Sequence, residues 1–361
     1  MKRPRVLHVI DKLTGGGAEV QLSYLVNNSN SAHTIVYSKL GGEELFSNDC
    51  VLIHIPNVNK LEFIVKLFNI VRNFDGEIVQ GWLPEYYSVI AAFSCFFNKK
   101  KYISCDRRAP VNKISKMYFR DRLKLISHIF SDLVVANFSL HSYGLMSRKL
   151  INKKKFVTIY NGYELKKDFK REGIAKSKFK DLKLFFVGRL VSQKRPLLVI
   201  DIFDAICDRF PNINFELKIF GDGVLKDVLL QKIDSSRFSS RIEFLGYTSN
   251  WIEVITQDAI LIYPSLKEGM PNIIFETVLN GNVFIASRIP EIEEHFMGVP
   301  EVFVEINDNE TFSFCEHLTK LISDKEIIYD RLLSNAKLHS IDYMVNQWDF
   351  RYSELAKEFN E

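Results

Sequence analysis

The sequence predicts an α/β protein of two Rossmann-like domains that face each other across a cleft. Short apolar runs alternate with helical patterns along the whole chain, which is typical of parallel sheets with crossover helices. A polar, lysine-rich stretch at residues 166–183 interrupts this alternation. The chain has 361 residues, of which 47% are hydrophobic, and is longer than a domain with one ordinary compact core.

The first predicted domain covers residues 1–165. Its apolar runs are short, as expected for strands of a parallel sheet that are covered on both faces. A helix is expected after the first strand, at residues 18–27. The expected strands cover residues 6–10, 34–38, 51–55, 77–80, 102–104, 133–136 and 156–160.

The second predicted domain covers residues 184–340 and follows a linker at residues 166–183. It repeats the same alternation, with strands expected at residues 184–188, 217–223, 242–246, 259–264, 282–287 and 302–306. The segment 341–361 contains a closing helix at about residues 345–359. This helix can pack back on the first domain, which periodicity alone does not establish.

Composition predicts a soluble cytoplasmic protein. The five cysteines are widely spaced and form no Cys-x-x-Cys pair, which favours neither a disulfide framework nor a zinc site. The N-terminal apolar run is too short for a signal peptide or a membrane span, and no uninterrupted apolar run reaches about 18 residues. The net charge of +4 is unevenly divided, because residues 1–165 hold 23 Lys and Arg against 13 Asp and Glu.

The strongest local pattern is ILIYPSLKEGMPNIIFETVLNG, in which a strand ends at Pro264 and a helix begins near Asn272. A helix N-terminus after a parallel strand presents free N–H groups and a favourable dipole to an anion. Glu268 lies in the loop and Glu276 two turns along the helix, and such carboxylates can accept hydrogen bonds from sugar and ribose hydroxyls. For an isolated pair the alternative is a solvated loop residue and an ordinary helix glutamate.

A second pattern, FFVGRLVSQKRP, places Arg189 directly after a strand and Lys194 before a helix that starts near Pro196. Two cations and a helix N-terminus at the carboxyl end of a parallel strand suit a diphosphate. Either cation taken singly is more typical of a protein surface. Together with the glutamate loop, they indicate one site.

Four segments in order, GRLVSQKRP, IFGDG, FLGY and EGMPNIIFE, resemble the retaining glycosyltransferases of family 4, which have the GT-B fold. The resemblance covers most of the chain and is strongest from Leu184 to Glu294. It implies transfer of a sugar from a nucleotide diphosphate with retention of anomeric configuration and without a protein nucleophile. The leaving phosphate would help to take the proton of the acceptor.

The resemblance also implies residue roles. Arg189 and Lys194 would hold the donor diphosphate, Glu276 the ribose, and Glu268 the transferred sugar. Glu268, Arg189, Lys194 and Asp106 are the candidate catalytic residues. The further candidate donor contacts are Gly16, Gly17, Gly221, Tyr247, Gly269, Met270, Pro271 and Asn272.

The glycine run of LTGGGAEVQ lets the backbone of the first domain approach a phosphate or an acceptor. A dinucleotide oxidoreductase would need G-x-G-x-x-G, but Val20 stands three residues after Gly17, and no acidic ribose binder follows the next strand. A plain tight turn is the alternative. The run is similar to the GG-x-E loop of the family, which favours ligand contact at Gly16 and Gly17.

The acceptor side departs from the family, which often carries a histidine after a first-domain strand. Here YISCDRR stands at that place. Asp106 can orient an acceptor hydroxyl, and Arg107 with Arg108 can bind an acceptor phosphate, with a solvated loop as the alternative. Trp82 and Glu85, after another strand, either face the cleft or pack at the strand end.

No metal or other cofactor is expected, because no Asp-x-Asp follows a strand and the histidines show no ligand spacing. Cations at residues 112–124, 99–101 and 153–155 can dock the first domain on anionic lipid at the inner face of the cytoplasmic membrane, or they form a solvated face. No nucleic-acid-binding pattern is present.

The predicted function is therefore a glycosyltransferase that uses a nucleotide sugar, with UDP as the expected nucleotide, on a glycan or lipid-diphosphate-linked acceptor. Bacterial surface polysaccharide such as O-antigen, lipopolysaccharide or capsule is the expected product. The alternatives are a non-catalytic subunit that binds nucleotide sugars, and a sugar-nucleotide epimerase or a phosphorylase on the same architecture. The Glu-x7-Glu pattern with Arg189 and Lys194 argues against the last two.

Overall fold

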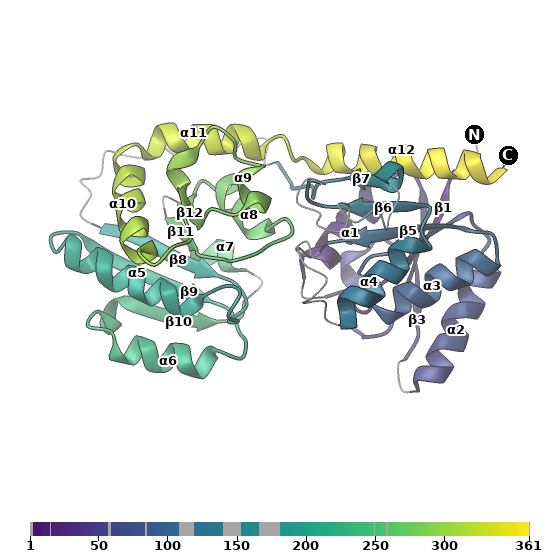
Figure 1. The fold of residues 1–361 in the computed structure, drawn as a ribbon, viewed down its shortest axis with the longest axis horizontal. Coiled ribbons are helices and arrows are strands. Elements are labelled where there is room, and N and C mark those ends of the chain that lie inside the picture. Colours follow the sequence, from purple (N-terminus) through teal and green to yellow (C-terminus); the bar gives the residue numbers. More distant parts are fainter. Residues whose placement is uncertain are drawn as a thin grey trace. The chain divides into compact units, whose positions relative to one another are not determined.

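The computed structural model describes residues 3–14, 16–56, 59–83, 85–107, 119–139, 153–165, 181–248, 250–257 and 259–360. The chain forms two compact units. Unit 1 consists of Met1–Glu164 and His339–Glu361, and unit 2 is Leu165–Leu338. Each unit is a parallel sheet with helices packed on it (Figure 1).

The sheet of unit 1 has the strand order β3-β2-β1-β4-β5-β6-β7, and every pairing is parallel. All strands expected in this half form, with ends displaced by at most two residues. They are β1 (Arg5–Val9), β2 (Ala32–Tyr37), β3 (Val51–His54), β4 (Ile78–Gly81), β5 (Lys101–Asp106), β6 (Leu133–Ala136) and β7 (Phe156–Thr158).

Helices cover both faces of this sheet and bury its apolar side chains. On one face, α1 (Gly17–Asn28) and α12 (Ile341–Asn360) share a core with the strands, which includes Leu22, Trp348 and Tyr352. On the other face, α2 (Lys60–Asn73) and α3 (Tyr86–Phe97) enclose a second core. A further helix, α4 (Phe119–Ile129), packs beside α3.

The closing helix α12 therefore belongs to unit 1, although 174 residues of unit 2 precede it in the chain. Tyr352 donates a hydrogen bond of 2.6 Å to Oε1 of Gln80, a fully buried residue of β4. The carboxylate of Asp349 accepts hydrogen bonds from Ser31 and from the backbone N–H of Asn30. These contacts fix the helix on the sheet that the first half of the chain builds.

The sheet of unit 2 has the order β10-β9-β8-β11-β12-β13, again parallel throughout. Its strands are β8 (Asp181–Val187), β9 (Asn214–Phe220), β10 (Ile242–Gly246), β11 (Ile260–Tyr263), β12 (Val283–Ser287) and β13 (Phe303–Val304). Its helices are α5 (Pro196–Arg209), α6 (Lys226–Ser235), α7 (Trp251–Val254), α8 (Asn272–Leu279), α9 (Pro290–Glu293), α10 (Glu310–Ser323) and α11 (Lys325–Ala336).

The first strand of unit 2 corrects the predicted linker. Residues 181–183, assigned to the linker 166–183, are the start of β8 and pair with Asn214, Phe215 and Glu216 of β9. The sequence did not predict this strand end, because only Leu182 of these three residues is buried and its neighbours Asp181 and Lys183 are charged and exposed. Residues 166–180 lie outside the described residues.

The sequential strand order reverses between β8 and β11 in unit 2 and between β1 and β4 in unit 1. Loops that leave the carboxyl ends of strands diverge at such a point, and α/β sheets bind ligands there. In unit 2, the two loops at this point are residues 188–195 and 264–271, which hold the two motifs of the sequence analysis. The fold thus brings both motifs to one edge of one sheet.

Candidate active site

Two helices begin at this edge without a side-chain cap. Helix α5 starts at Pro196 after the loop that leaves β8, and helix α8 starts at Asn272 after the loop that leaves β11, as predicted. Neither N-cap residue, Arg195 or Pro271, makes a side-chain cap hydrogen bond. The positive ends of two helices therefore lie at the carboxyl ends of neighbouring strands, an arrangement that favours an anion.

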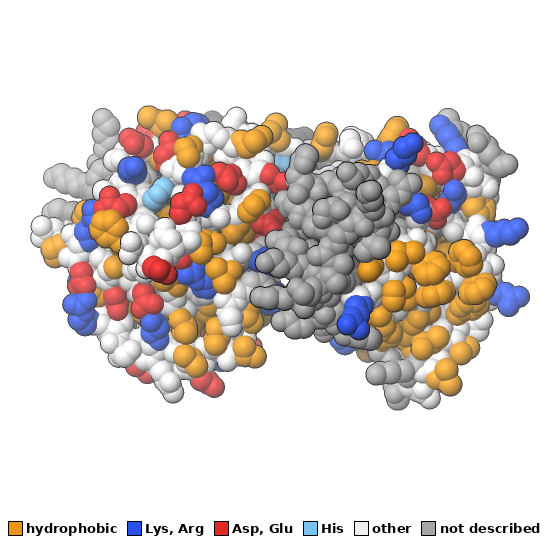
Figure 2. Space-filling view, viewed as in Figure 1, with side chains coloured by type: hydrophobic (Ala, Val, Ile, Leu, Met, Phe, Trp, Pro, Cys, Tyr) orange, Lys and Arg blue, Asp and Glu red, His pale blue; other side chains and the backbone are white. Residues whose placement is uncertain are grey.

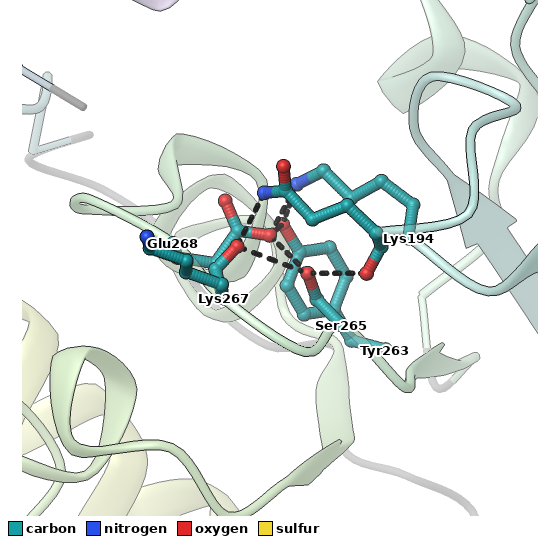
Figure 3. Close-up of polar contacts among 6 residues, drawn as sticks. Lys194, Tyr263, Ser265, Lys267 and Glu268 are labelled. Carbon is teal, nitrogen blue, oxygen red and sulfur yellow. Dashed lines mark hydrogen bonds and ion pairs between the residues drawn. The ribbon is translucent and has the colours of Figure 1, made fainter. Parts of the chain in front are cut away.

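Lys194 and Glu268 form an ion pair at the centre of the site (Figure 3). The ammonium group also donates a hydrogen bond of 2.5 Å to the hydroxyl of Tyr263. That hydroxyl donates in turn to Oε1 of Glu268 at 2.9 Å. The two motifs, 74 residues apart in the chain, thus converge on one carboxylate oxygen.

Further hydrogen bonds hold the two loops together. The hydroxyl of Ser265 donates to Oε1 of Glu268. The side chain of Gln193 donates to the carbonyl of Lys267 at 2.5 Å, and the carbonyl of Gln193 accepts from the backbone N–H of Leu266 at 2.9 Å. Because Gln193 bonds to two consecutive residues after Ser265, the glutamate loop is fixed against the loop that carries Lys194.

Burial and neighbouring charges have opposite effects on Lys194. Burial lowers the pKa of its ammonium group, Glu268 opposes that effect, and Arg189 adds to it. Arg189 itself is exposed, and its guanidinium makes no ion pair or hydrogen bond within the described ranges. A phosphate placed beside both cations would remove their mutual repulsion and pair the free guanidinium.

Glu276 is the second carboxylate of the site and differs from Glu268. Its side chain is only partly exposed, and burial alone raises its pKa to about 7. In the part of the chain that the structure describes, its carboxylate accepts no hydrogen bond and makes no ion pair. A desolvated carboxylate without a partner is costly unless a ligand supplies donors, as the two hydroxyls of a ribose would.

A second ion pair fixes the start of helix α5. Arg195 adopts a left-handed backbone conformation with φ +52° and donates two hydrogen bonds, of 2.8 and 2.5 Å, to the carboxylate of Glu310. Ser287, at the end of β12, also donates to Glu310 at 3.0 Å. Sequence reasoning missed Arg195 and Glu310, as well as Tyr263, Ser265 and Gln193, because their partners lie far away in the chain.

The remaining donor candidates of unit 2 lie around this pair. Met270 and Pro271 are buried before α8, whereas Gly269 and Asn272 are partly exposed. Tyr247 follows β10 and is exposed. Its donor contact stays a prediction.

The IFGDG turn supports the loop of Arg189 through backbone contacts. Gly221 has φ +147°, and a Cβ atom at this position would lie 1.9 Å from the carbonyl oxygen of Gly188. The N–H of Leu190 donates to the carbonyl of Asp222 at 2.8 Å. Gly221 therefore allows two turns to pack closely. The sequence analysis predicted a donor contact for Gly221 and did not predict this packing role.

In unit 1, the predicted GG-x-E loop opens helix α1. Gly17 is exposed and Gly16 partly exposed at the start of this helix, and Gly15 lies outside the described residues. The buried carboxylate of Glu19 folds back over Gly16, where a Cβ atom would lie 2.3 Å from its Oε2. Burial raises the pKa of Glu19, while a bond from its own backbone N–H opposes the shift. Glycine at position 16 thus makes room for this carboxylate.

Trp82 lies in the core and not on the surface. It is fully buried, and its Nε1–H donates to Nδ1 of His8 at 2.9 Å. Of the two predicted alternatives, packing at the strand end describes its position. The guanidinium of Arg107 stacks over the indole ring at 4.3 Å and donates to Oδ1 of Asn161 at 2.7 Å.

Asp106 is the last residue of β5 and is fully buried, so the solvated-loop alternative is wrong for this residue. Its Oδ2 lies 3.8 Å from Nε2 of His128, a buried residue of α4. Its contact with an acceptor hydroxyl stays a prediction. Glu85 precedes α3 and is partly exposed. Arg108 lies outside the described residues, as do residues 112–118 of the basic stretch.

Among the residues that the structure describes, no group of three or more His, Cys, Asp or Glu side chains is arranged to hold a metal ion. Metal independence remains a prediction that only a chelator experiment tests. The five cysteines form no disulfide with one another.

Unit 2 brings Lys194, Glu268 and two uncapped helix N-termini together at a sheet switch point, an arrangement typical of proteins that bind an anionic ligand. Comparisons with known proteins identify the kind of enzyme. Residues 181–324 match the family model of the glycosyl transferases group 1. The match covers the strands and helices that build the site, and together with the relatives it identifies the chain as a glycosyltransferase.

Relatives and solved structures agree with this assignment. The capsular polysaccharide biosynthesis glycosyltransferase CapH of Staphylococcus aureus is 26% identical over 80% of this chain and 83% of its own length. A Campylobacter jejuni enzyme, N-acetylgalactosamine-N,N'-diacetylbacillosaminyl-diphospho-undecaprenol 4-alpha-N-acetylgalactosaminyltransferase, is 26% identical over 74% of this chain and 73% of its own. HepE of Anabaena, solved in complex with UDP and glucose, has a TM-score of 0.80 at 15% identity, covering 98% of this chain and 100% of HepE. This likeness confirms the GT-B fold.

Proposed function

We propose that this glycosyltransferase retains anomeric configuration and transfers a sugar from a UDP-linked donor to a lipid-diphosphate-linked glycan. The product would be a bacterial capsule or O-antigen-like polysaccharide. The observation that carries the proposal is the convergence of Lys194 and Glu268 beside Arg189 and the N-termini of α5 and α8.

The names of relatives support the acceptor class. One relative is a capsule biosynthesis enzyme, and another has a diphospho-undecaprenol acceptor in its name. An Escherichia coli relative, UDP-Gal:alpha-D-GlcNAc-diphosphoundecaprenol alpha-1,3-galactosyltransferase, is 28% identical over 48% of this chain and 47% of its own. Its name combines a UDP-linked donor with a lipid-diphosphate acceptor, which is the combination we propose here.

The site residues would divide the work by charge. Arg189 and Lys194 would stabilise the negative charge that builds on the departing diphosphate, and the dipoles of α5 and α8 would add to this. Glu268 would accept hydrogen bonds from hydroxyls of the transferred sugar while Lys194 remains between it and the phosphate. Glu276 would accept from the ribose. The leaving phosphate would take the acceptor proton, so that no side chain serves as nucleophile.

The experiment that tests the donor site is calorimetric binding of UDP, GDP and ADP to the full chain in excess chelator. We expect one nucleotide, UDP, to bind, and Glu276→Ala to weaken that binding at least roughly tenfold, as the loss of a charge-assisted hydrogen bond implies. Glu253→Gln is the matched control, because Glu253 is an exposed glutamate of α7 in the same unit. Binding of GDP or ADP alone would overturn the UDP assignment, and unchanged affinity in Glu276→Ala would overturn the site.

Turnover separates a transferase from a non-catalytic binding subunit. A purified lipid-diphosphate acceptor and the donor selected by the binding experiment should give a product with the donor's anomeric configuration, also in chelator. Arg189→Ala and Lys194→Ala should lower kcat more than they weaken substrate binding, because their charges act mainly in the transition state. An inverted product would refute retention, and unchanged kcat in both variants would refute their assignment.

We also propose that the enzyme acts at the inner face of the cytoplasmic membrane, where such acceptors would be available. None of the helices in the described ranges combines the length and the low charge that crossing a bilayer requires.

A further inference from the structure

Unit 1 carries an exposed apolar surface on the helices that cover one face of its sheet. Figure 2 shows hydrophobic side chains gathered over α2, α3 and α4. We call this the phenylalanine surface and define it by its exposed residues Leu61, Ile64, Val65, Phe93, Phe96, Phe97 and Ile129. Monomeric proteins rarely expose so many large apolar side chains together without a partner.

Helix α3 provides the centre of this surface. Its twelve residues include no charged side chain. Phe93, Phe96 and Phe97 are spaced i, i+3 and i+4, so they form one stripe on the outside of the helix. Phe96 and Phe97 are 65% and 69% exposed. The outer face of a helix that contacts only water usually carries polar residues. The phenylalanine stripe therefore indicates contact with an apolar partner.

The residue directly after α4 holds two of these phenylalanines in place. The ring of Phe130, which follows α4, lies 4.6 Å from the ring of Phe93 and 5.9 Å from that of Phe96. Phe96 and Phe97 contact each other edge to face at 5.6 Å. The surface is thus preorganised, because the rings pack on one another before any partner is bound.

Cations surround the phenylalanine surface. Arg72 near the end of α2, Lys99 just after α3 and Arg122 on α4 are exposed, and none of them makes an ion pair within the described ranges. Lys100 anchors the ends of α2 and α3 to each other, because its Nζ donates to the carbonyls of Phe74 and Gly76. Arg122 and Ile129 are seven residues apart, two turns along the same side of α4.

We propose that the phenylalanine surface docks unit 1 on a bilayer that contains anionic lipid, with the phenyl rings among the acyl chains and the three cations at the lipid phosphates. An amphipathic surface of this composition, apolar in the centre and cationic around it, fits an anionic interface. The inference rests on the proposed function, because a lipid-linked acceptor would require the enzyme to work at a membrane.

Charge decides between a membrane and a second copy of the chain. In a symmetric dimer each copy would present the same surface, so Arg72, Lys99 and Arg122 of both copies would approach one another. Like charges around an interface disfavour association, whereas anionic lipid complements them. On the surface itself Glu62 is paired with Lys66, so it does not offset the charges of Arg72, Lys99 and Arg122.

The test is flotation of the full chain with vesicles of phosphatidylcholine alone and of phosphatidylcholine mixed with phosphatidylglycerol. We expect co-flotation with the mixed vesicles that falls at high salt, and Phe96→Ser with Phe97→Ser should lower it by roughly tenfold or more. Arg72→Glu with Lys99→Glu should abolish the preference for anionic vesicles. Phe312→Ser is the matched control, because Phe312 is 62% exposed on α10 of unit 2.

Three outcomes would overturn the proposal. One is equal flotation of the Phe96→Ser, Phe97→Ser variant and the control. Another is equal binding to both kinds of vesicle. The third is a dimer in light scattering that the double variant dissociates, which would assign the surface to a second copy.

Nucleotide binding by unit 2 distinguishes this proposal from the proposed function. If the protein binds vesicles but no nucleotide, the proposed function is refuted and the membrane-docking proposal is retained. If it binds nucleotide and turns over but does not bind vesicles, the docking proposal is refuted and the proposed function is retained.

Discussion

Replacement of Glu276 by glutamine should stabilise the protein and weaken nucleotide binding at the same time. The carboxylate is desolvated, and it has no hydrogen-bond partner in the part of the chain that the structure describes. Burial raises its pKa from the ordinary value of 4.5 to about 7. A residue kept in an unfavourable environment for its ligand shows this pattern, because the ligand supplies the missing donors.

The sign and size follow from the linkage between protonation and folding. The folded state holds the proton up to about pH 7, whereas the unfolded state releases it near 4.5. Stability is therefore lost as pH rises from 4.5 to 7, and the full penalty is present above pH 7. The difference between these two pKa values corresponds to about 3 kcal/mol. Glu276→Gln should recover up to that amount at pH 8 and much less at pH 5.

Urea unfolding of the wild type and of Glu276→Gln at pH 5, 6, 7 and 8 measures this difference. Trp251 is the tryptophan of unit 2, so its fluorescence follows the unit that contains Glu276. Glu253→Gln is again the control and should change stability by less than about 0.5 kcal/mol at every pH. A stability difference between Glu276→Gln and the wild type that does not depend on pH would refute the reasoning.

Three further predictions concern other parts of the structure. Gly221→Ala should destabilise unit 2 by about 3 kcal/mol or more in urea unfolding, because the Cβ atom would meet the Gly188 carbonyl oxygen at 1.9 Å. Arg195→Ala should cost about 3 kcal/mol in the same assay, since it leaves the buried carboxylate of Glu310 without its bidentate partner. Burial lowers the pKa of His33 from 6.5 to about 4, so protonation favours unfolding of unit 1, and this one group should cost unit 1 about 2 kcal/mol between pH 7 and pH 5, a loss that His33→Gln removes.

Matched variants serve as controls for the first two. Gly298→Ala also places alanine at a positive φ, +83°, but no atom lies within 4 Å of its Cβ, so it should cost less than Gly221→Ala. Arg209→Ala breaks an ion pair with Glu316 in which both side chains are more than a third exposed, and it should cost less than about 1 kcal/mol. Equal costs within either pair of variants would contradict the packing argument for Gly221 or the burial argument for Arg195. A pH profile of His33→Gln parallel to that of the wild type would assign the acid sensitivity to other groups.

Much of the fold could be predicted from the sequence because a buried parallel strand has a strong local signature. Strands such as Leu133–Ala136 and Ile242–Gly246 begin and end at the residues that hydrophobic patterning indicated. The starts of α5 and α8 were also predicted, since proline and strand-to-loop transitions act locally. Residues 181–183 were misassigned because two of the three are charged and exposed, so the burial pattern of β8 is weak there.

The candidate site also combines features that the local sequence determined with features that only the tertiary structure determined. Local sequence determined that Arg189 and Lys194 precede one helix and that Glu268 and Glu276 flank the start of another. Only the tertiary structure decided that Lys194 pairs with Glu268 and that the carboxylate of Glu276 is desolvated, with no partner among the described residues. It also placed Trp82 in the core, where the sequence left a surface position open. The physical reason is that burial and pairing depend on groups brought together across many residues, whereas strand and helix formation depends on neighbours in the chain.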